Sequence, residues 1–416
     1  MKAVSRTDPN LGGGRALGTA DLGLWVEASL DTAEARARTL AICAQVSADD
    51  PRAQLASDPA WLLAGGLGQG ESTVVYLCYL GAEVVGYAAF RVGPSRLPVT
   101  LFGVGLGGIG VGKMTLVGCP LFRSSALACE SALIDGLLRV LARHLGARDV
   151  VFLLGLRADS QLFAMTAREG RRVPGFRLLP YGPTYQRRLI AMPDSYAEYL
   201  AGLGRKTRED LRRHHRKLFA LPGRTVRVER FAAPEAVDRF VADACGLSAA
   251  TYQTRQLGVG LQDSAQFRAA LRFAAEQGWL IAYILYCDAE PIAFMLGYLR
   301  GGTYYSEHIG YHPDWYKQSA GNVLHLEVVR DLIESGADVR CFDFLYGDNS
   351  NKKNLANQSR TERNLYLIKA SWRGIATHAL LLGLNTLTET VGGYLESRGV
   401  KAKIRRALRR NALRRS

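Results

Sequence analysis

The segment between residues 307 and 353 holds the side chains best suited to chemistry. Glu307 and His308 are neighbours on a run that reads as a β-strand, and either side chain could relay a proton. Because successive side chains of a strand point to opposite faces, we expect at most one of the two to face a cleft. Proton transfer at this strand is therefore the first chemistry that the sequence suggests.

Asp343 and Lys352 are two further charged candidates in the same segment. Asp343 lies between Phe342 and Phe344 on a predicted central strand, and a buried carboxylate must either find hydrogen-bond donors or hold its proton. This favours a structural anchor, with proton acceptance as the alternative. Lys352 follows the strand and could neutralise an anion, although Lys353 competes for that role and a solvated surface lysine is equally expected.

A loop rich in small residues lies between these candidates and leads into a helix. A helix N-terminus presents free backbone N–H groups and the positive end of the helix dipole, which together favour an anion. Gly321 allows close approach of a ligand, because it has no Cβ. We expect the cofactor-binding residues to be Gln318, Ser319, Ala320, Gly321, Asn322 and Val323.

Two halves of the chain with a similar order of secondary-structure elements must position these residues. Each half contains a hairpin of β-branched and aromatic residues, then a long helix, then an apolar strand. We predict an α+β fold with a mixed sheet, built from two tandem lobes, each a mostly antiparallel sheet flanked by helices. The predicted segments are a disordered N-terminus at 1–20, lobes at 21–190 and 191–372, a buried packing helix at 373–400 and a basic tail at 401–416.

The sequence around these residues resembles the GNAT acyltransferase superfamily. Gln318-x-x-Gly321-x-Val323 is similar to its acyl-CoA pyrophosphate loop, Q/R-x-x-G-x-G/A, except at the last position. Asp343-Phe344-x-x-Gly347 followed by Lys352 resembles the D-F-x-x-G-x-x-x-Y-K signature of the tandem-GNAT branch, with Asn351 in place of the aromatic residue. That branch includes Fem-type peptidyltransferases and CelD-like acyltransferases of exopolysaccharide loci. The resemblance covers residues 190–372 well and the first half only in its layout.

The resemblance implies the reaction and its participants. The strand 303–311 would offer backbone N–H groups to the acyl carbonyl, and the loop 318–323 would hold the pyrophosphate of acetyl-CoA or another acyl-CoA. Glu307 would relay the proton of the amine, and Tyr346 would be a candidate acid for the leaving thiolate, with Tyr304 and Tyr305 as alternatives. We predict N-acyl transfer, most simply N-acetyl transfer, to an amine on a small or carbohydrate-like acceptor, without a metal.

Charge and composition leave two other functions open. The net charge of +15 comes mainly from residues 205–217, which hold seven Lys/Arg against two acids, and from 401–416, which hold eight and no acid. These patches favour an anionic partner: a membrane surface at the tail, or nucleic acid. The alternatives are an aminoacyl-tRNA-dependent Fem-type transferase, disfavoured by the missing coiled-coil arm, and a non-catalytic GNAT scaffold that binds membrane or nucleic acid.

Several other patterns are rejected as functional motifs. The run GVGLGGIGVG at 103–112 contains G-x-G-x-x-G but is followed by extended chain rather than a helix, so we expect a glycine-rich strand. His308 and His312 form H-x-x-x-H on extended chain, which is a poor metal site. Scattered cysteines without C-x-x-C, and the lack of an apolar signal peptide or membrane span, predict a cytoplasmic protein, peripheral at the inner face of the membrane if the tail binds lipid.

Overall fold

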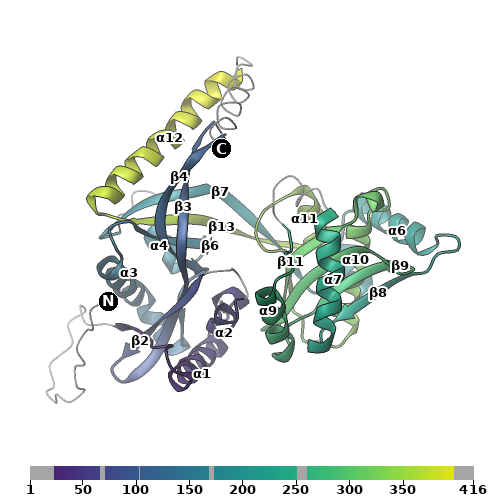
Figure 1. Cartoon of the computed structure of the whole chain (residues 1–416), viewed down its shortest axis with the longest axis horizontal. Coiled ribbons are helices and arrows are strands. Elements are labelled where there is room, and N and C mark those ends of the chain that lie inside the picture. Colours follow the sequence, from purple (N-terminus) through teal and green to yellow (C-terminus); the bar gives the residue numbers. More distant parts are fainter. Residues whose placement is uncertain (1–22, 66–70, 103, 168–172, 251–259, 398–416) are drawn as a thin grey trace.

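The computed structural model describes residues 23–65, 71–102, 104–167, 173–250 and 260–397, and the chain forms two lobes joined by long strands (Figure 1). The predicted disordered N-terminus at 1–20 and the tail at 401–416 lie outside these residues. Both lobes combine a sheet with flanking helices, which confirms the predicted mixed α/β fold class.

The first lobe contains an antiparallel meander, then a helix, then a strand parallel to the last strand of the meander. The meander is β2–β3–β4, the helix is α3, and β6 pairs with β4 in parallel. The elements are β1 (Leu24–Glu27), α1 (Ala33–Asp49), η1 (Leu55–Ser57), α2 (Pro59–Leu63), β2 (Ser72–Leu80), β3 (Glu83–Leu101), β4 (Val104–Val117), β5 (Leu121–Phe122), η2 (Ser124–Cys129), α3 (Glu130–His144), β6 (Asp149–Arg157), α4 (Gln161–Thr166) and β7 (Phe176–Ala191).

The second lobe repeats this order. Its meander is β9–β10–β11, the helix is α10, and β12 pairs with β11 in parallel. The elements are α5 (Tyr196–Gly202), α6 (Arg205–Phe219), β8 (Val226–Phe231), η3 (Pro234–Ala236), α7 (Val237–Ala250), α9 (Ala265–Glu276), β9 (Ala282–Cys287), β10 (Glu290–Arg300), β11 (Thr303–Tyr311), η4 (Pro313–Trp315), α10 (Ala320–Glu334), β12 (Cys341–Asp343) and α11 (Ser350–Leu355). The last two elements of the chain, β13 (Gln358–Lys369) and α12 (Trp372–Ser397), pack against strands of the first lobe.

The strands of both lobes form one continuous sheet. Across the described residues the order is β1-β2-β3-β4-β6-β13-β7-β12-β11-β10-β9-β8. The lobes exchange strands at the junction: β7 leaves the first lobe and its last residues pair with β12, whereas β13 returns from the second lobe and lies between β6 and β7. The strand predicted near 364–370 is therefore β13, and its neighbours belong to the first lobe.

The glycine-rich run is a strand, as expected. It forms most of β4, which pairs with β3 in a long antiparallel hairpin from Leu101↔Val104 to Phe90↔Leu116. The G-x-G-x-x-G pattern thus contributes extended backbone rather than a loop before a helix. The rejection of a dinucleotide fingerprint is confirmed.

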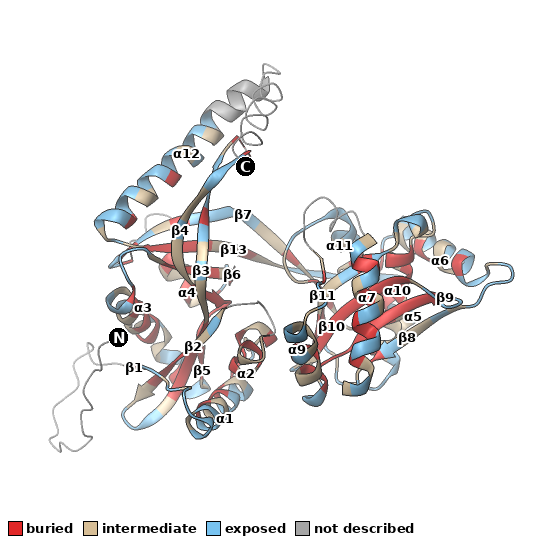
Figure 2. Cartoon of the chain, viewed as in Figure 1, coloured by how far each residue is buried: buried red, intermediate tan, exposed pale blue. Residues whose placement is uncertain are grey.

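The prediction that the helix near 373–400 is buried is wrong. Helix α12 packs on the sheet with one side, through residues such as Leu381, and over residues 372–388 its opposite side is exposed (Figure 2). A largely apolar, leucine-rich sequence suggested burial, but no second layer covers the outer side in the part of the chain that the structure describes. None of the described helices is long and apolar enough to cross a bilayer.

Candidate active site

The two central parallel strands of the second lobe separate after a short contact. Strand β11 pairs with β10 along its length, but with β12 only from Thr303↔Cys341 to Tyr305↔Asp343. Strand β12 then ends, and Leu345 adopts a left-handed backbone (φ 56°) that turns the chain away from β11. Beyond Tyr305, this edge of β11 has no partner strand among the described residues. Its backbone amides are therefore available to a ligand.

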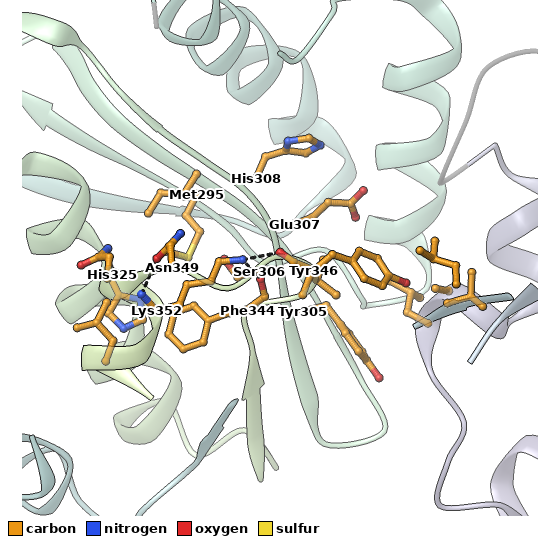
Figure 3. Close-up of a pocket in the computed structure, with 18 of the residues that line it drawn as sticks. Met295, Tyr305, Ser306, Glu307, His308, His325, Phe344, Tyr346, Asn349 and Lys352 are labelled. Carbon is orange, nitrogen blue, oxygen red and sulfur yellow. Dashed lines mark hydrogen bonds between the residues drawn. The ribbon is translucent and has the colours of Figure 1, made fainter. Parts of the chain in front are cut away.

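A cavity of about 620 Å³ opens at this separation, between the two lobes (Figure 3). The second lobe contributes β11, the start of α10, the loop after β12 and α11. The first lobe contributes the opposite wall, including Leu55, Trp61, Arg91 and Leu154. A cleft with apolar walls and a few converging polar groups is the usual form of a ligand site.

Glu307 and His308 both line this cavity, contrary to the expectation that at most one would. The pairing of β11 with β10 shifts at this point: Ser306 lies opposite Gly297 and His308 opposite Leu296, so that Glu307 is an extra residue. A β-bulge of this kind breaks the alternation of side chains and re-aims them locally. The polar–apolar pattern of the sequence did not reveal it.

Burial gives Glu307 the electrostatics of a base that works near neutral pH. Loss of solvent raises the pKa of its carboxyl to about 7, against the opposing attraction of the Arg91 guanidinium. Arg91, on β3 of the first lobe, also pairs with Glu71 at 3.2 Å. Burial lowers the pKa of His308, which favours its neutral imidazole. Either group can accept a proton at physiological pH.

Lys352 is held inside the site rather than in solvent. Its Nζ donates hydrogen bonds to the carbonyl oxygens of Phe344 (2.8 Å) and Tyr346 (2.7 Å), and its backbone N–H donates to the Asn349 side chain at the start of α11 (2.8 Å; Figure 3). Burial lowers the pKa of this ammonium group, while the charge of Asp343 raises it. Lys352 lines the cavity, whereas its competitor Lys353 is exposed.

Asp343 is an anchor within a buried ion-pair network, as the sequence favoured. Its carboxylate accepts a bidentate hydrogen bond from Arg187 of β7 (2.8 and 2.7 Å) and a further bond from the backbone N–H of Leu345. Arg187 also pairs with Glu362 of β13 at 3.6 Å. Burial alone would lower the pKa of Arg187, but the two carboxylates raise it well above its usual value. The network therefore joins β7 and β13, the strands exchanged between the lobes, to β12 beside the cavity.

The three candidate tyrosines occupy different environments. Tyr346 lines the cavity, and the guanidinium carbon of Arg187 lies 5.1 Å from the centroid of the Tyr346 ring. Burial raises the pKa of the Tyr346 hydroxyl. Tyr305 also lines the cavity, and burial raises its pKa to about 12. Tyr304 is fully buried in the core of the second lobe, where its hydroxyl donates to the Ile281 carbonyl. Only Tyr346 and Tyr305 can reach a ligand in the cavity.

The predicted pyrophosphate loop forms the N-terminus of α10. Ser319 precedes the helix with a left-handed backbone (φ 56°), and Ala320 and Gly321 are its first residues. The N–H groups of a helix's first residues have no partner within the helix. A Cβ on Gly321 would lie 3.0 Å from the Tyr311 ring, so a larger side chain cannot be accommodated without a shift.

The other loop residues divide between cavity and core. Asn322 lines the cavity, and its side-chain oxygen accepts a hydrogen bond from Asn351 of α11 at 2.9 Å. Val323 is buried in the core, and the side-chain oxygen of Gln318 is buried with no hydrogen-bond partner in the described chain. The structure thus brings the start of α10, Lys352, Glu307 and Tyr346 to one cavity.

The sequence did not predict His325 or any residue of the first lobe at the site. His325 lines the cavity, and burial lowers its pKa to about 3, so its imidazole is neutral; Nε2 lies 3.2 Å from the Tyr199 hydroxyl. A polar residue on the buried side of a helix was the available signal. Arg91 and Trp61 gave no signal, because only the tertiary fold brings them to the cavity.

Comparison with known proteins shows a sequence similarity that covers most of this site. Residues 205–353, from α6 to α11, match the acetyltransferase (GNAT) domain model. The second lobe is therefore similar in sequence to a GNAT domain. The loop 318–323 and the signature from Asp343 to Lys352, on which the predicted resemblance depended, both lie inside this match, and the resemblance is confirmed.

Solved structures show how far the fold extends. The FemX crystal structure superposes with a TM-score of 0.53 at 12% identity, covering 78% of this chain and 94% of FemX. A tandem GNAT protein from the clavulanic acid biosynthesis pathway has a TM-score of 0.43 at 12% identity, covering 84% of this chain and 99% of its own. The first likeness shows that both lobes share the FemX fold. No curated protein matches the chain in sequence.

The site contains no evident metal centre among the described residues, where no three His, Cys, Asp or Glu side chains converge. Its groups instead suit an anionic ligand that carries an acyl group. The helix N-terminus and Lys352 favour phosphate, the open edge of β11 provides hydrogen-bond donors, and Glu307 can accept a proton.

Proposed function

We propose that this protein is an acyl-CoA-dependent N-acyltransferase, most simply an N-acetyltransferase. The observation that carries the proposal is Glu307, a carboxylate on a bulge beside the open edge of β11, with its pKa raised to about 7. A base poised near neutral pH, next to backbone donors for an oxyanion, is what acyl transfer to an amine requires.

The donor would lie across the start of α10. The N-terminal N–H groups around Gly321, with the helix dipole, would hold the pyrophosphate of acyl-CoA. The acyl carbonyl would then meet the backbone amides along the open edge of β11. Lys352 uses two of its three N–H donors on backbone carbonyls, so one remains to reduce negative charge in the site.

The reaction balances with the groups present. Glu307 takes a proton from the ammonium form of the acceptor, and the free amine attacks the thioester carbonyl to form a C–N bond. The tetrahedral oxyanion accepts hydrogen bonds from the β11 edge, and the C–S bond then breaks. The thiolate leaves and gains a proton, for which Tyr346 is a candidate acid, and the attacking nitrogen loses its second proton, which restores that acid. The products are an amide, free CoA and the one proton taken up by Glu307.

The acceptor would enter from the first lobe. The wall opposite β11 combines apolar Leu55 and Trp61 with the Arg91 guanidinium, which suits a compact acceptor that carries both apolar and hydrogen-bonding groups. A small or carbohydrate-like amine, such as a building block of an exopolysaccharide or cell envelope, fits this description.

Release of free CoA from acetyl-CoA tests the proposal, measured with a panel of primary amines and amino sugars. We expect Glu307→Gln to lower kcat/KM by roughly 10²–10⁴. We also expect the wild-type rate to rise about tenfold per pH unit below pH 7 and to level off above it, since the base must be deprotonated. Glu276→Gln, an exposed change on α9, is the matched control. Equal rates for the Glu307 variant and the wild type would refute the assignment.

An aminoacyl-tRNA-dependent transferase is the second candidate. It is favoured by the shared FemX fold and by α6, which exposes Lys206, Arg212, Arg216 and Lys217. Ion pairs to Glu209 and Asp210 neutralise only part of this helix. Binding of charged tRNA but not of acetyl-CoA would move the assignment to this class. Binding of neither would favour a non-catalytic scaffold.

A further inference from the structure

Helix α12 presents an apolar side to solvent. Its inner side is fixed to the sheet: Leu381 is buried, and the His378 ring nitrogen Nε2 lies 3.0 Å from the Leu178 carbonyl oxygen. The outer side carries large apolar side chains with high exposed fractions. These are Trp372 (74%), Ile375 (42%), Leu380 (51%), Leu382 (44%) and Leu387 (43%).

The distal part of the β3–β4 hairpin extends this surface. It projects from the lobes together with α12 (Figure 1), and the backbone N–H of Phe102 donates to the Thr388 hydroxyl at 3.2 Å. Leu106 on β4 is 48% exposed. A groove of about 430 Å³ runs between the start of α12 and the hairpin, lined by Ile109, Val111 and Trp372 among others. We call residues 372–388 of α12 and residues 93–102 and 104–112 of the hairpin the projecting surface.

The charged residues of the projecting surface, Arg96 and Arg373, are both basic, and the two acidic residues of α12, Glu389 and Glu396, come later in the helix. The chain has no acidic residue in 84–129 or in 363–388, whereas Arg96 and Arg373 are exposed there. Asp149 lines the groove beside exposed Arg148, and its carboxylate accepts a hydrogen bond from the Gly146 N–H at 2.6 Å. In sequence, α12 leads directly to 401–416, with eight Lys/Arg and no acid.

We infer that the projecting surface is a docking surface for an anionic lipid bilayer. A helix whose apolar side enters the boundary of the acyl chains, accompanied by basic residues that attract anionic headgroups, is the usual form of interfacial binding. Tryptophan prefers this boundary, because its ring is apolar and its N–H is polar. A second copy of the chain is a poorer occupant, since it would bring two basic tails together.

Sedimentation with vesicles tests the inference on the full chain. Mixed phosphatidylglycerol–phosphatidylcholine vesicles should bind the protein, and pure phosphatidylcholine vesicles should bind it much less. Leu380→Glu combined with Leu387→Glu should weaken binding roughly tenfold or more, because two apolar contacts are lost. The matched control adds the same charge elsewhere, with Leu127→Glu and Tyr316→Glu at exposed positions, and should retain most of the binding.

Deletion of 401–416 separates the two contributions. It should weaken binding to anionic vesicles and reduce its dependence on salt, while leaving the effect of the double leucine change intact. Any of three results would overturn the inference. These are absence of binding to either kind of vesicle, an equal loss of binding in the double variant and its control, and a double variant that binds as the wild type does. So would a dimer in solution that the double leucine change dissociates, because the occupant would then be a second copy.

Discussion

At the scale of single residues, the central feature is a carboxylate that the fold keeps partly away from water. The bulge in β11 turns Glu307 into the cavity, and burial raises its pKa to about 7. A buried carboxylate with a raised pKa is useful as a base. Its ionisation in the folded protein also lowers the stability of the fold, and this loss can be measured without knowing the acceptor.

The pH dependence of stability reports this cost. In the unfolded chain Glu307 ionises near its ordinary pKa of 4.5, whereas in the folded chain it holds its proton to about pH 7. Folding therefore loses stability as pH rises through this window. The midpoint of thermal unfolding of Glu307→Gln should exceed that of the wild type by a margin that grows from pH 5 to pH 8. A constant margin would show that the site is better hydrated than the structure indicates.

The Arg187 network predicts a large effect on stability. Arg187→Ala removes the bidentate partner of buried Asp343 and leaves Arg360 as the remaining cation beside Asp343 and Glu362, which should lower the free energy of unfolding by about 3–5 kcal/mol. Urea unfolding measures it. Arg205→Ala breaks an exposed pair with Glu209 and should cost less than about 1 kcal/mol. Equal small effects would mean that the buried network does not hold the junction.

The sequence predicted which residues belong to the site better than it predicted their partners and orientations. The physical reason is that the partners lie far away in sequence. Asp343 was expected to need donors because phenylalanines flank it, but nothing local pointed to Arg187 on a strand of the other lobe. Glu307 was found by residue type, while its orientation depended on a bulge that a register shift against β10 creates. Short-range pattern identifies a candidate group, and only tertiary pairing sets its partners.

At the scale of elements, two helix starts build the anion side of the site. Helix α10 begins at Ala320 beside Tyr311, and the short α11 begins after Asn349, with the Asn322–Asn351 hydrogen bond joining the two. The start of α10 was predictable from its small-residue loop. The exposure of α12 was not, because a run of leucines looks the same in a core and on an uncovered surface.

Removing the cap of α11 tests its role in positioning Lys352. Asn349→Ala deletes the oxygen that accepts the Lys352 N–H and should cost about 1 kcal/mol of stability. It should also weaken acetyl-CoA binding several-fold. Ser195→Ala removes the equivalent cap of α5, where Ser195 accepts from the Glu198 N–H, and should cost similar stability without affecting binding. Unchanged binding in both variants would separate α11 from the donor site.

At the scale of the whole molecule, the lobes are not separable units. Strand β13 lies between two strands of the first lobe, and β7 supplies the neighbour of β12 in the second. The sequence predicted a boundary near residue 190 because the secondary-structure order repeats there. It could not predict the strand exchange, since pairing across a lobe junction leaves no local pattern.

The exchange predicts cooperative unfolding. The full chain should show one calorimetric transition for both lobes. Residues 191–372 expressed alone lack β7 and leave β13 without either neighbour, so this fragment should show no cooperative transition. Stable, cooperative unfolding of the fragment would mean that the second lobe folds independently of the exchange.

Calorimetric titration of the full chain with acetyl-CoA and with free CoA tests the central claim most directly. Gly321→Trp should abolish binding, because the indole must displace Tyr311 and would obstruct the start of α10. Gly246→Trp, at an open and exposed helical position, is the matched control and should bind as the wild type does. We expect micromolar binding that only the Gly321 change removes. Absence of binding to the wild type, or binding that survives Gly321→Trp, would contradict an acyl-CoA site at this helix.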